Sequence, residues 1–498
     1  MDLLRTKSIE QSIHDTDEPE YQLRKSLSWL DLTVFGVGVV IGAGIFTLTG
    51  RAAHSVAGPS IVLSFVLAAF ACGLAGMCYA EFASTVPVSG SAYTFSYASL
   101  GEFFAWVIGW DLILEMFLGA SVVAQGWSIY LEILLGKFGI TIPAAVAYGS
   151  HFDLMAALLV IVLGALVALG IKESMRVNLA LVSLKVFIVL FVIFAGLQFV
   201  RPANYSPFIP PSAPAAVGSG LTQPLFQWFT GAAPSNFGIS GIFAGAALVF
   251  FAYIGFDVVA TAAEETRNPQ RDLPIGIILS LVICTVLYVA VTLVVTGMVR
   301  YDKLDPDGAL AAAFVQNGRS WMGALISAGA VAGLTTVVLT LMVGATRLIF
   351  AMARDNLLPM GLAKVHPVHR TPWLITIVVT VVCALVAGFT PVGKLEEMVN
   401  IGTLSAFVLV SIGVWVLRRK RPDLKRSFRV PLVPWLPILS AVVCFWLMLN
   451  LSIETWLRFV IWFVIGLFIY FGYSYKHSRL GTGRPLSPEF EEILLENH

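Results

Sequence analysis

The chain has 498 residues, of which 58% are hydrophobic and only 12% are charged, and its formal net charge is +1. Soluble domains carry about a quarter charged residues, so this composition excludes an ordinary soluble protein and indicates one that lies in a lipid bilayer. A nearly neutral chain gives no reason to expect a nucleic-acid partner. The five cysteines all fall in hydrophobic runs without metal-ligand spacing, so we expect no disulfide, metal or other cofactor.

Twelve hydrophobic runs are long enough to be membrane-spanning helices, which need about 18 or more apolar residues. They cover residues 31–56, 59–83, 102–135, 153–171, 178–200, 238–263, 273–299, 321–352, 372–390, 396–417, 432–452 and 456–475. The sequence therefore predicts an all-α integral membrane fold of twelve transmembrane helices.

The predicted helices divide the chain into six parts. These are a tail 1–28, five helices in 29–200, a loop 201–237, five helices in 238–417, two further helices in 418–475 and a tail 476–498. With the N-terminus inside the cell, the inner segments carry 22 Lys and Arg residues and the outer segments carry 8. Cytoplasmic loops are enriched in these residues, so we expect both tails in the cytoplasm and the protein in the cell membrane.

The predicted outer loop 201–237 contains seven prolines and only one charged residue, Arg201. A disordered tether would be more polar than this segment. We expect the loop to fold over the outer mouth of the protein with Phe226, Trp228 and Phe229, and a plain surface loop is the alternative.

The first predicted span contains a glycine-rich stretch, FGVGVVIGAGIFTLTG, at residues 35–50. Gly costs about 1 kcal/mol relative to Ala inside a helix, so its clustering predicts a break at Gly42-Ala43-Gly44. Irregular backbone persists at membrane depth only where it is buried in protein or lines a cavity. The half-helix after the break would direct free N–H groups at an anion, and the half before it would present carbonyls to a cation. An α-amino acid zwitterion fits this arrangement; glycines that merely allow close helix packing are the alternative.

A second break is expected in the sixth span, within GAALVFFAYIGFDVVATAA at residues 245–263, which holds Gly255 and Asp257. If spans 1–5 and 6–10 form two halves, the first and sixth spans correspond. Five spans in each half make the halves inverted relative to each other. Interrupted spans at matching positions of two halves indicate an alternating-access binding site between them.

Four sequence motifs resemble one transporter superfamily. They are LSWLDLTVFGVGVVIGAGIFTLTG, MCYAEFASTVPVSGSAYTFSYASLGEFFAWVIGWDLILE, ATAAEETRNPQRDLPIGI and RLIFAMARDNLLP. The chain is similar to the amino acid–polyamine–organocation superfamily, and within it to bacterial homologues of the cationic amino acid transporter family, from about Gln22 to Tyr475. The resemblance implies two inverted five-helix repeats with broken helices 1 and 6, two peripheral helices, and proton-coupled amino acid transport.

The resemblance also implies the residues of the substrate site. The amides of Gly42, Ala43 and Gly44 would hold the substrate carboxylate, and the carbonyls of Ile41, Phe251, Ala252 and Ile254 would hold its ammonium group. Neutral backbone dipoles can pair both charges without burying an ionised side chain.

Two side chains are further candidates for the site. Leu334, in the eighth span, is the expected floor of the pocket, and its bulk favours small neutral amino acids over cationic ones. Glu115, one helical turn after Asp111, resembles an acid that family members carry on the third helix. A role for Glu115 in substrate binding and a role as an interhelical hydrogen-bonded strut both stay open.

Lys185 is the only Lys or Arg deep in a predicted span. It stands about eight residues from Val177, roughly 12 Å along a helix, which is far for its side chain to reach the membrane surface. Burial makes a lysine easier to deprotonate, so Lys185 is the candidate carrier of the coupling proton. The resemblance adds that a lysine here can occupy the place that sodium takes in sodium-coupled relatives.

The leading hypothesis is a secondary active amino acid transporter with an amino acid and a proton as partners. An amino acid exchanger, or a cationic amino acid uniporter or symporter, is the alternative. A membrane-embedded enzyme is not expected, because every His falls near a span end, in a loop or in a tail. The sequence leaves open a small membrane subunit or a homo-oligomer.

Overall fold

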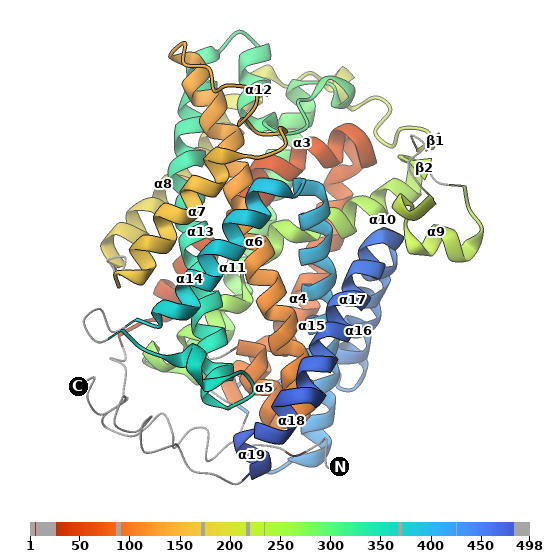
Figure 1. The fold of residues 1–498 in the computed structure, drawn as a ribbon. Coiled ribbons are helices and arrows are strands. Elements are labelled where there is room, and N and C mark those ends of the chain that lie inside the picture. Colours follow the sequence, from red (N-terminus) through yellow and green to blue (C-terminus); the bar gives the residue numbers. More distant parts are fainter. Residues whose placement is uncertain are drawn as a thin grey trace.

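The computed structural model describes residues 5, 26–85, 91–170, 175–215, 220–233, 235–366, 371–424 and 426–482, and Figure 1 shows them as a bundle of long helices. Most of the predicted tails 1–28 and 476–498 lies outside this range. We use inner for the end of the bundle that carries helices α5 and α18, and outer for the end with α12 and the β1–β2 pair (Figure 1).

The helices follow one another with short connections. Before the outer loop they are α2 (Trp29–Val40), α3 (Thr49–Ala52), α4 (Ile61–Thr85), α5 (Ser91–Ser99), α6 (Glu102–Lys137), α7 (Leu154–Ala168) and α8 (Met175–Gly196). After it come α10 (Gly238–Val249), α11 (Pro269–Met298), α12 (Ala309–Gln316), α13 (Ser320–Arg354), α14 (Trp373–Phe389), α15 (Val392–Lys420), α16 (Trp435–Leu449), α17 (Ile453–Ile469), α18 (Tyr475–His477) and α19 (Arg479–Thr482).

The described residues form an all-α membrane protein, as the sequence predicts. Eight helical runs are long and apolar enough to cross a membrane: Gly44–Thr85, Glu102–Lys137, Leu179–Phe199, Gly238–Ala260, Pro269–Met298, Ser320–Arg354, Val392–Lys420 and Ile453–Thr482. Four shorter apolar helices, α2, α7, α14 and α16, accompany them. The number of twelve spans and the inverted relation of the two halves stay predictions.

Local sequence explains where several helices begin. Ser28 and Asp31 form a capping box at the start of α2, in which each side chain binds the backbone N–H of the other residue. The Asp153 side chain caps α7 by accepting from the N–H of Ala156 at 3.0 Å. Pro269 starts α11, where its missing N–H leaves no hydrogen bond unmade.

The centre of the bundle is formed by α6 and α13, which pack along each other, while α11 packs along both α4 and α2. Each of these helices is apolar along most of its length, and its small residues allow close approach. A methyl group at Gly333 of α13, for example, would stand 2.8 Å from the Lys185 side chain of α8. The two breaks predicted from glycine lie within this tightly packed centre.

The described parts of the outer segment, 201–215, 220–233 and 235–237, are folded but differ from the prediction for two of the aromatic residues. Strands β1 (Ala213–Pro214) and β2 (Ser235–Asn236) pair antiparallel, and helix α9 (Leu225–Thr230) lies between them in the sequence. The Phe226 ring packs on Trp446 of α16, with ring centroids 4.4 Å apart. Trp228 and Phe229 are 56% and 65% exposed, so these two side chains do not close over the protein.

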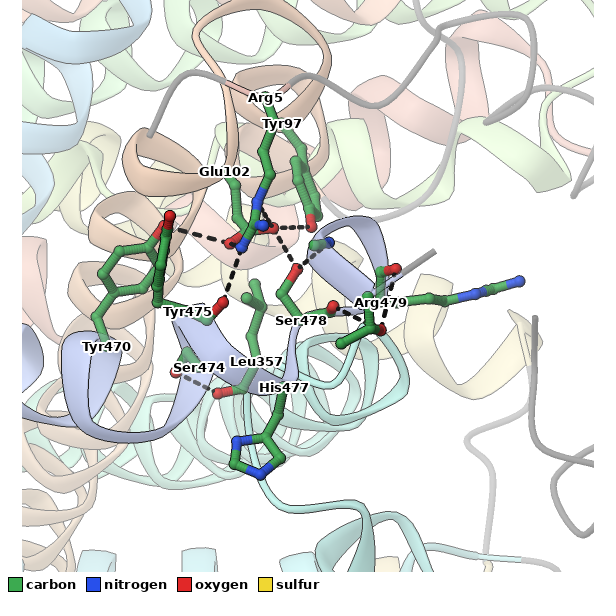
Figure 2. Close-up of polar contacts among 12 residues, drawn as sticks. Arg5, Tyr97, Glu102, Leu357, Tyr470, Ser474, Tyr475, His477, Ser478 and Arg479 are labelled. Atoms are coloured by element: carbon green, nitrogen blue, oxygen red, sulfur yellow. Dashed lines mark hydrogen bonds and ion pairs between the residues drawn. The ribbon is translucent and has the colours of Figure 1, made fainter. Parts of the chain in front are cut away.

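At the inner end, one buried carboxylate joins both ends of the chain (Figure 2). Arg5 donates two hydrogen bonds to Glu102 at the start of α6, at 3.0 and 2.7 Å. Tyr97 and Tyr470 donate to the same carboxylate at 3.1 and 3.2 Å, and the hydroxyl of Ser478 also donates to it. Residues from positions 5, 97 and 470–478 thus meet around Glu102.

Candidate functional site

The first predicted break is present, slightly earlier than the glycine spacing indicates. Helix α2 ends at Val40, and Ile41 has a non-helical backbone with ψ of 84°. Ala43 is already helical, and a π-helix covers Gly44–Leu48 before α3 begins. The interruption is therefore at Ile41 and Gly42, and the glycine at 44 belongs to the half-helix that follows.

Side chains from two other helices donate to carbonyls at the end of α2, where the N–H of Gly42 already donates to the carbonyl of Val40 at 2.8 Å. The Nζ atom of Lys185 donates to the carbonyl of Gly38 at 2.7 Å. The hydroxyl of Tyr288, on α11, donates to the carbonyl of Val40 at 2.7 Å. Lys185 is 1% exposed, so its side chain reaches the backbone of α2 rather than the membrane surface.

The second break is longer than the first. Helix α10 ends at Val249, a 3-10 turn covers Phe250–Tyr253, and Ile254 is extended. Gly255 has φ of +111°, where a side chain is strained, and a methyl group there would stand 2.6 Å from Val39 of α2. A 3-10 helix then covers Asp257–Glu265.

The carbonyls at the end of α10 bind a neutral side chain. The amide nitrogen of Asn400, on α15, donates to the carbonyl of Ala247 at 2.8 Å and to that of Leu248 at 3.0 Å. Asn400 is fully buried. A backbone that has lost its helical partners at membrane depth needs such donors, because the lipid offers none.

The two breaks touch each other. A methyl group at Gly44 would stand 2.3 Å from the Cα atom and 2.9 Å from the backbone nitrogen of Ala252. Ile41, Gly42, Ala43, Phe251 and Ala252 are all buried, and Ile254 is half-buried. The residues proposed from the resemblance to hold a substrate backbone thus come from two segments, more than 200 positions apart in sequence, that are in contact at Gly44 and Ala252.

Leu334 lies beside the first break. Leu334 and Ala43 both lie close to Gly126 of α6. A methyl group at Gly126 would be 3.4 Å from the Cβ atom of Ala43 and 3.8 Å from a terminal methyl of Leu334. Leu334 is fully buried, and the preceding residue, Gly333, contacts the stem of Lys185. The structure therefore groups Ala43, Leu334 and Lys185.

Glu115 lies in a different part of the centre. It lies near Asp257, just after the second break, and near Thr403 of α15. The hydroxyl of Tyr79 and one oxygen each of Asp111 and Asp257 are buried there without a hydrogen-bond partner among the described residues. Three buried oxygen atoms without a partner among the described residues give this region the capacity to hold water or a proton.

Further out, Arg51 links the second half of the first span to three other segments. Its guanidinium binds Glu396 of α15 at 2.8 Å, Asp307 before α12 at 2.6 Å and the hydroxyl of Tyr148 at 3.3 Å. Glu396 is fully buried. This network joins α3 to the beginning of α15 and to the segments that hold Tyr148 and Asp307.

Two residues of the site escaped the sequence analysis. Tyr288 and Asn400 bind carbonyls at the two breaks, yet neither is charged at neutral pH, so neither stands out among the charged residues within the spans. An asparagine inside an apolar span was the available signal, since polar side chains within membrane helices usually bind another helix. In the part of the chain that the structure describes, no group of three or more His, Cys, Asp or Glu side chains could hold a metal ion.

Comparison with known proteins agrees with this architecture. The family described as "Amino acid permease" matches residues 27–473. The chain is 47% identical to a methylthioribose transporter of Bacillus subtilis (strain 168), over 92% of this chain and 95% of the relative. It is 46% identical to the branched-chain amino acid permease BcaP of the same organism, over 96% and 99% of the two chains.

A more distant relative comes from a plant. The vacuolar cationic amino acid transporter 4 of Arabidopsis thaliana is 38% identical, over 84% of this chain and 68% of the relative. The matched family spans both breaks, Lys185 and Leu334. The chain therefore belongs to the amino acid permease family of the amino acid–polyamine–organocation superfamily.

Proposed function

We propose that the protein is a secondary active transporter that takes up α-amino acids together with protons by alternating access. The two broken helices support this proposal, because they bring backbone N–H and C=O groups together at the centre of a membrane protein. Such groups suit a ligand with a carboxylate and an ammonium group. The relatives named as amino acid permeases support the same class of substrate.

In this proposal the substrate enters between the two breaks. The amides of Gly42, Ala43 and Gly44 bind its carboxylate. The carbonyls of Ile41, Phe251, Ala252 and Ile254 bind its ammonium group. Because Gly44 and Ala252 are now in contact, substrate binding must separate them, and this movement provides a physical link between the ligand and the arrangement of the half-helices.

The observation that carries the proton-coupling proposal is the 2.7 Å hydrogen bond from the Lys185 ammonium to the carbonyl of Gly38. Hydrogen bonds to charged groups contribute about 1.5–3 kcal/mol, against about 1 kcal/mol for neutral ones. Loss of the proton would weaken the attachment of α2 to α8 by enough to shift a two-state equilibrium about tenfold. Proton binding and the position of the first half-helix would thus be linked.

The side chain of the substrate is proposed to be small or medium-sized and neutral. Leu334 presents an apolar group beside Ala43. BcaP, a relative over nearly the whole chain, is named for branched-chain amino acids. The methylthioribose transporter, equally similar, makes a thioether sugar a necessary comparison in any substrate test.

Uptake by proteoliposomes tests the proposal. Labelled alanine, valine, leucine, arginine and methylthioribose are offered to vesicles with and without an inward proton gradient. We expect neutral amino acids to accumulate only with the gradient and a protonophore to abolish the accumulation. Uptake that requires amino acid inside the vesicle and ignores the gradient would identify an exchanger. Preference for arginine or for methylthioribose would overturn the proposed substrate.

A further inference from the structure

A groove of about 330 Å³ lies between α15 and α16 on the outside of the bundle. The bottom of the groove is formed by small residues. Ala441 carries only a methyl group. Ser411 and Ser440 bring the two helices close together, with their hydroxyl oxygens 2.9 Å apart. Larger apolar side chains rise on both sides, namely Ile412, Trp415, Ile438, Val442 and Phe445. Three of them, Ile412, Val442 and Phe445, are 38%, 59% and 47% exposed.

The inner end of this groove is strongly basic. Residues 418–429 contain seven Lys and Arg residues and one acid, Asp423. Among the described residues, three of these cations are paired, because Arg418 and Arg426 both bind Glu81 and Arg421 binds Asp423. The helix that forms one wall of the groove therefore ends in a charge excess that its own loop does not neutralise.

Arg419 and Lys420 are the cations left at the end of α15. Both are exposed, and among the described residues neither has a carboxylate partner. The Arg419 guanidinium stacks on the ring of Trp415, 4.6 Å from its centroid. Since Trp415 also lines the groove, the Arg419 cation lies directly beside the apolar groove.

We propose that this groove binds an anionic glycerophospholipid of the inner leaflet, with an acyl chain between α15 and α16 and its phosphate against Arg419 and Lys420. The positive charge excess predicts that this end of α15 faces the cytoplasm. Basic pockets between helices on that side suit anionic headgroups, and the apolar groove suits an acyl chain. Trp435, at the start of α16, is 73% exposed, as expected for an aromatic side chain at headgroup depth.

The bound lipid would hold a helix that also supports the centre of the protein. Helix α15 carries Asn400, which binds the carbonyls at the second break. A lipid that ties α15 to α16 would limit how far that helix moves. Binding at this groove is independent of which solute the protein carries.

Native mass spectrometry of the full chain in detergent tests the proposal, with phosphatidylglycerol and phosphatidylcholine of identical acyl chains as probes. We expect phosphatidylglycerol to be retained in preference. Arg419→Gln and Lys420→Gln should each lower its retention about fivefold, the factor expected for one basic residue near an anionic headgroup. Ala441→Trp, which fills the groove, should lower retention of both lipids.

Arg421→Gln is the matched control, because it removes a cation of the same loop that already has a carboxylate partner. It should leave phosphatidylglycerol retention nearly unchanged. An equal loss with Arg421→Gln and Arg419→Gln would mean attraction by the whole loop, and unchanged retention in Ala441→Trp would exclude the groove; either result overturns the proposal. So would equal retention of the two lipids, or a dimer that Ala441→Trp abolishes. Elution of each variant as a single species establishes that it is folded.

Discussion

The two helix breaks solve the same problem with different chemistry. At the first, the carbonyl of Gly38 binds the ammonium of Lys185. At the second, the carbonyls of Ala247 and Leu248 bind the amide of Asn400. Both donors are buried and both come from another helix, but only the lysine can lose a proton.

This difference separates two roles that a broken helix can have. The carboxamide of Asn400 does not titrate at physiological pH. Its hydrogen bonds to the carbonyls at the second break therefore do not depend on pH. The ammonium donor at the first break has a strength that depends on its protonation. In the proposed function, α2 is therefore the part of the site that loss of the Lys185 proton would loosen, and the following variants test that asymmetry.

The largest effect is expected where the two breaks touch. Gly44→Val would drive its side chain into Ala252, whose Cα atom already lies 2.3 Å from a methyl group placed at Gly44. Substrate binding should fall below detection in a ligand-dependent thermal shift assay. Gly42→Ala is the control, since a methyl there meets Val337 at an ordinary 3.5 Å, and it should elute like the parent protein. Near-normal binding by Gly44→Val would remove Gly44 from the site.

Lys185→Met tests the titratable donor directly. It keeps the length of the side chain and removes its charge, so uptake driven by a pH gradient should disappear. Binding and amino acid counterflow should survive, because the proposed ligand contacts are backbone groups elsewhere. Accumulation of substrate by Lys185→Met when only protons can drive it would make the lysine structural and assign the proton to another group.

Asn400→Leu tests the fixed donor at the second break. Loss of the two hydrogen bonds of Asn400 should cost about 1–3 kcal/mol of stability. We expect the midpoint of thermal unfolding to fall equally at pH 6 and pH 8. Asn450→Leu is the control, because the amide of Asn450, directly after α16, donates to the carbonyl of Trp446 in that neighbouring helix, and its effect should be smaller. A pH-dependent loss in Asn400→Leu would break the distinction between the two donors.

Leu334→Ser should change selectivity more than stability. Removal of the apolar group beside Ala43 enlarges the space next to the first break, so arginine and lysine should compete better for uptake of a neutral amino acid. Leu341→Ser, on the same helix but next to Gly119, should leave that competition unchanged. If arginine competes equally in the parent and in Leu334→Ser, Leu334 is not part of the pocket.

Tyr288→Phe should have the smallest effect. It removes one neutral hydrogen bond, to the carbonyl of Val40, which contributes about 1 kcal/mol. We expect a slightly lower pH-driven uptake rate. Tyr253→Phe removes a similar bond to Phe65 and should lower stability without changing uptake. Equal rates in the two variants would show that the Val40 carbonyl needs no second donor.

The sequence indicates the breaks and the buried lysine because glycines in a helix and a charged residue in an apolar span are visible locally in the sequence. Gly255 needs its positive φ, the spacing of Gly42 and Gly44 weakens a helix, and a lone Lys185 in an apolar run is conspicuous. The approximate boundaries of the long helices can also be predicted, because each helix corresponds to one continuous hydrophobic run. These features can be found without knowing which helices are neighbours.

Partner residues could not be found in this way. The acceptors of Lys185, Tyr288 and Asn400 are backbone carbonyls, which no residue type marks, and they lie 147 to 248 positions away in sequence. Which carbonyl meets which donor depends on how the helices pack. Likewise, the exposed Trp228 was expected to close the outer face, because its hydrophobicity says nothing about which surface it occupies.

The carboxylate of Glu102 bears on how the protein is made. This carboxylate is buried at the start of the third predicted span. Three of its partners, Arg5, Tyr470 and Ser478, lie near the two ends of the chain. Synthesis must pass the last membrane helix before this charge is fully compensated. A chain that stops short of position 470 would keep a buried charge with too few donors, which is strongly unfavourable. We expect such truncated chains to be degraded faster than full-length ones in a pulse-chase experiment, and Glu102→Gln to reduce that difference.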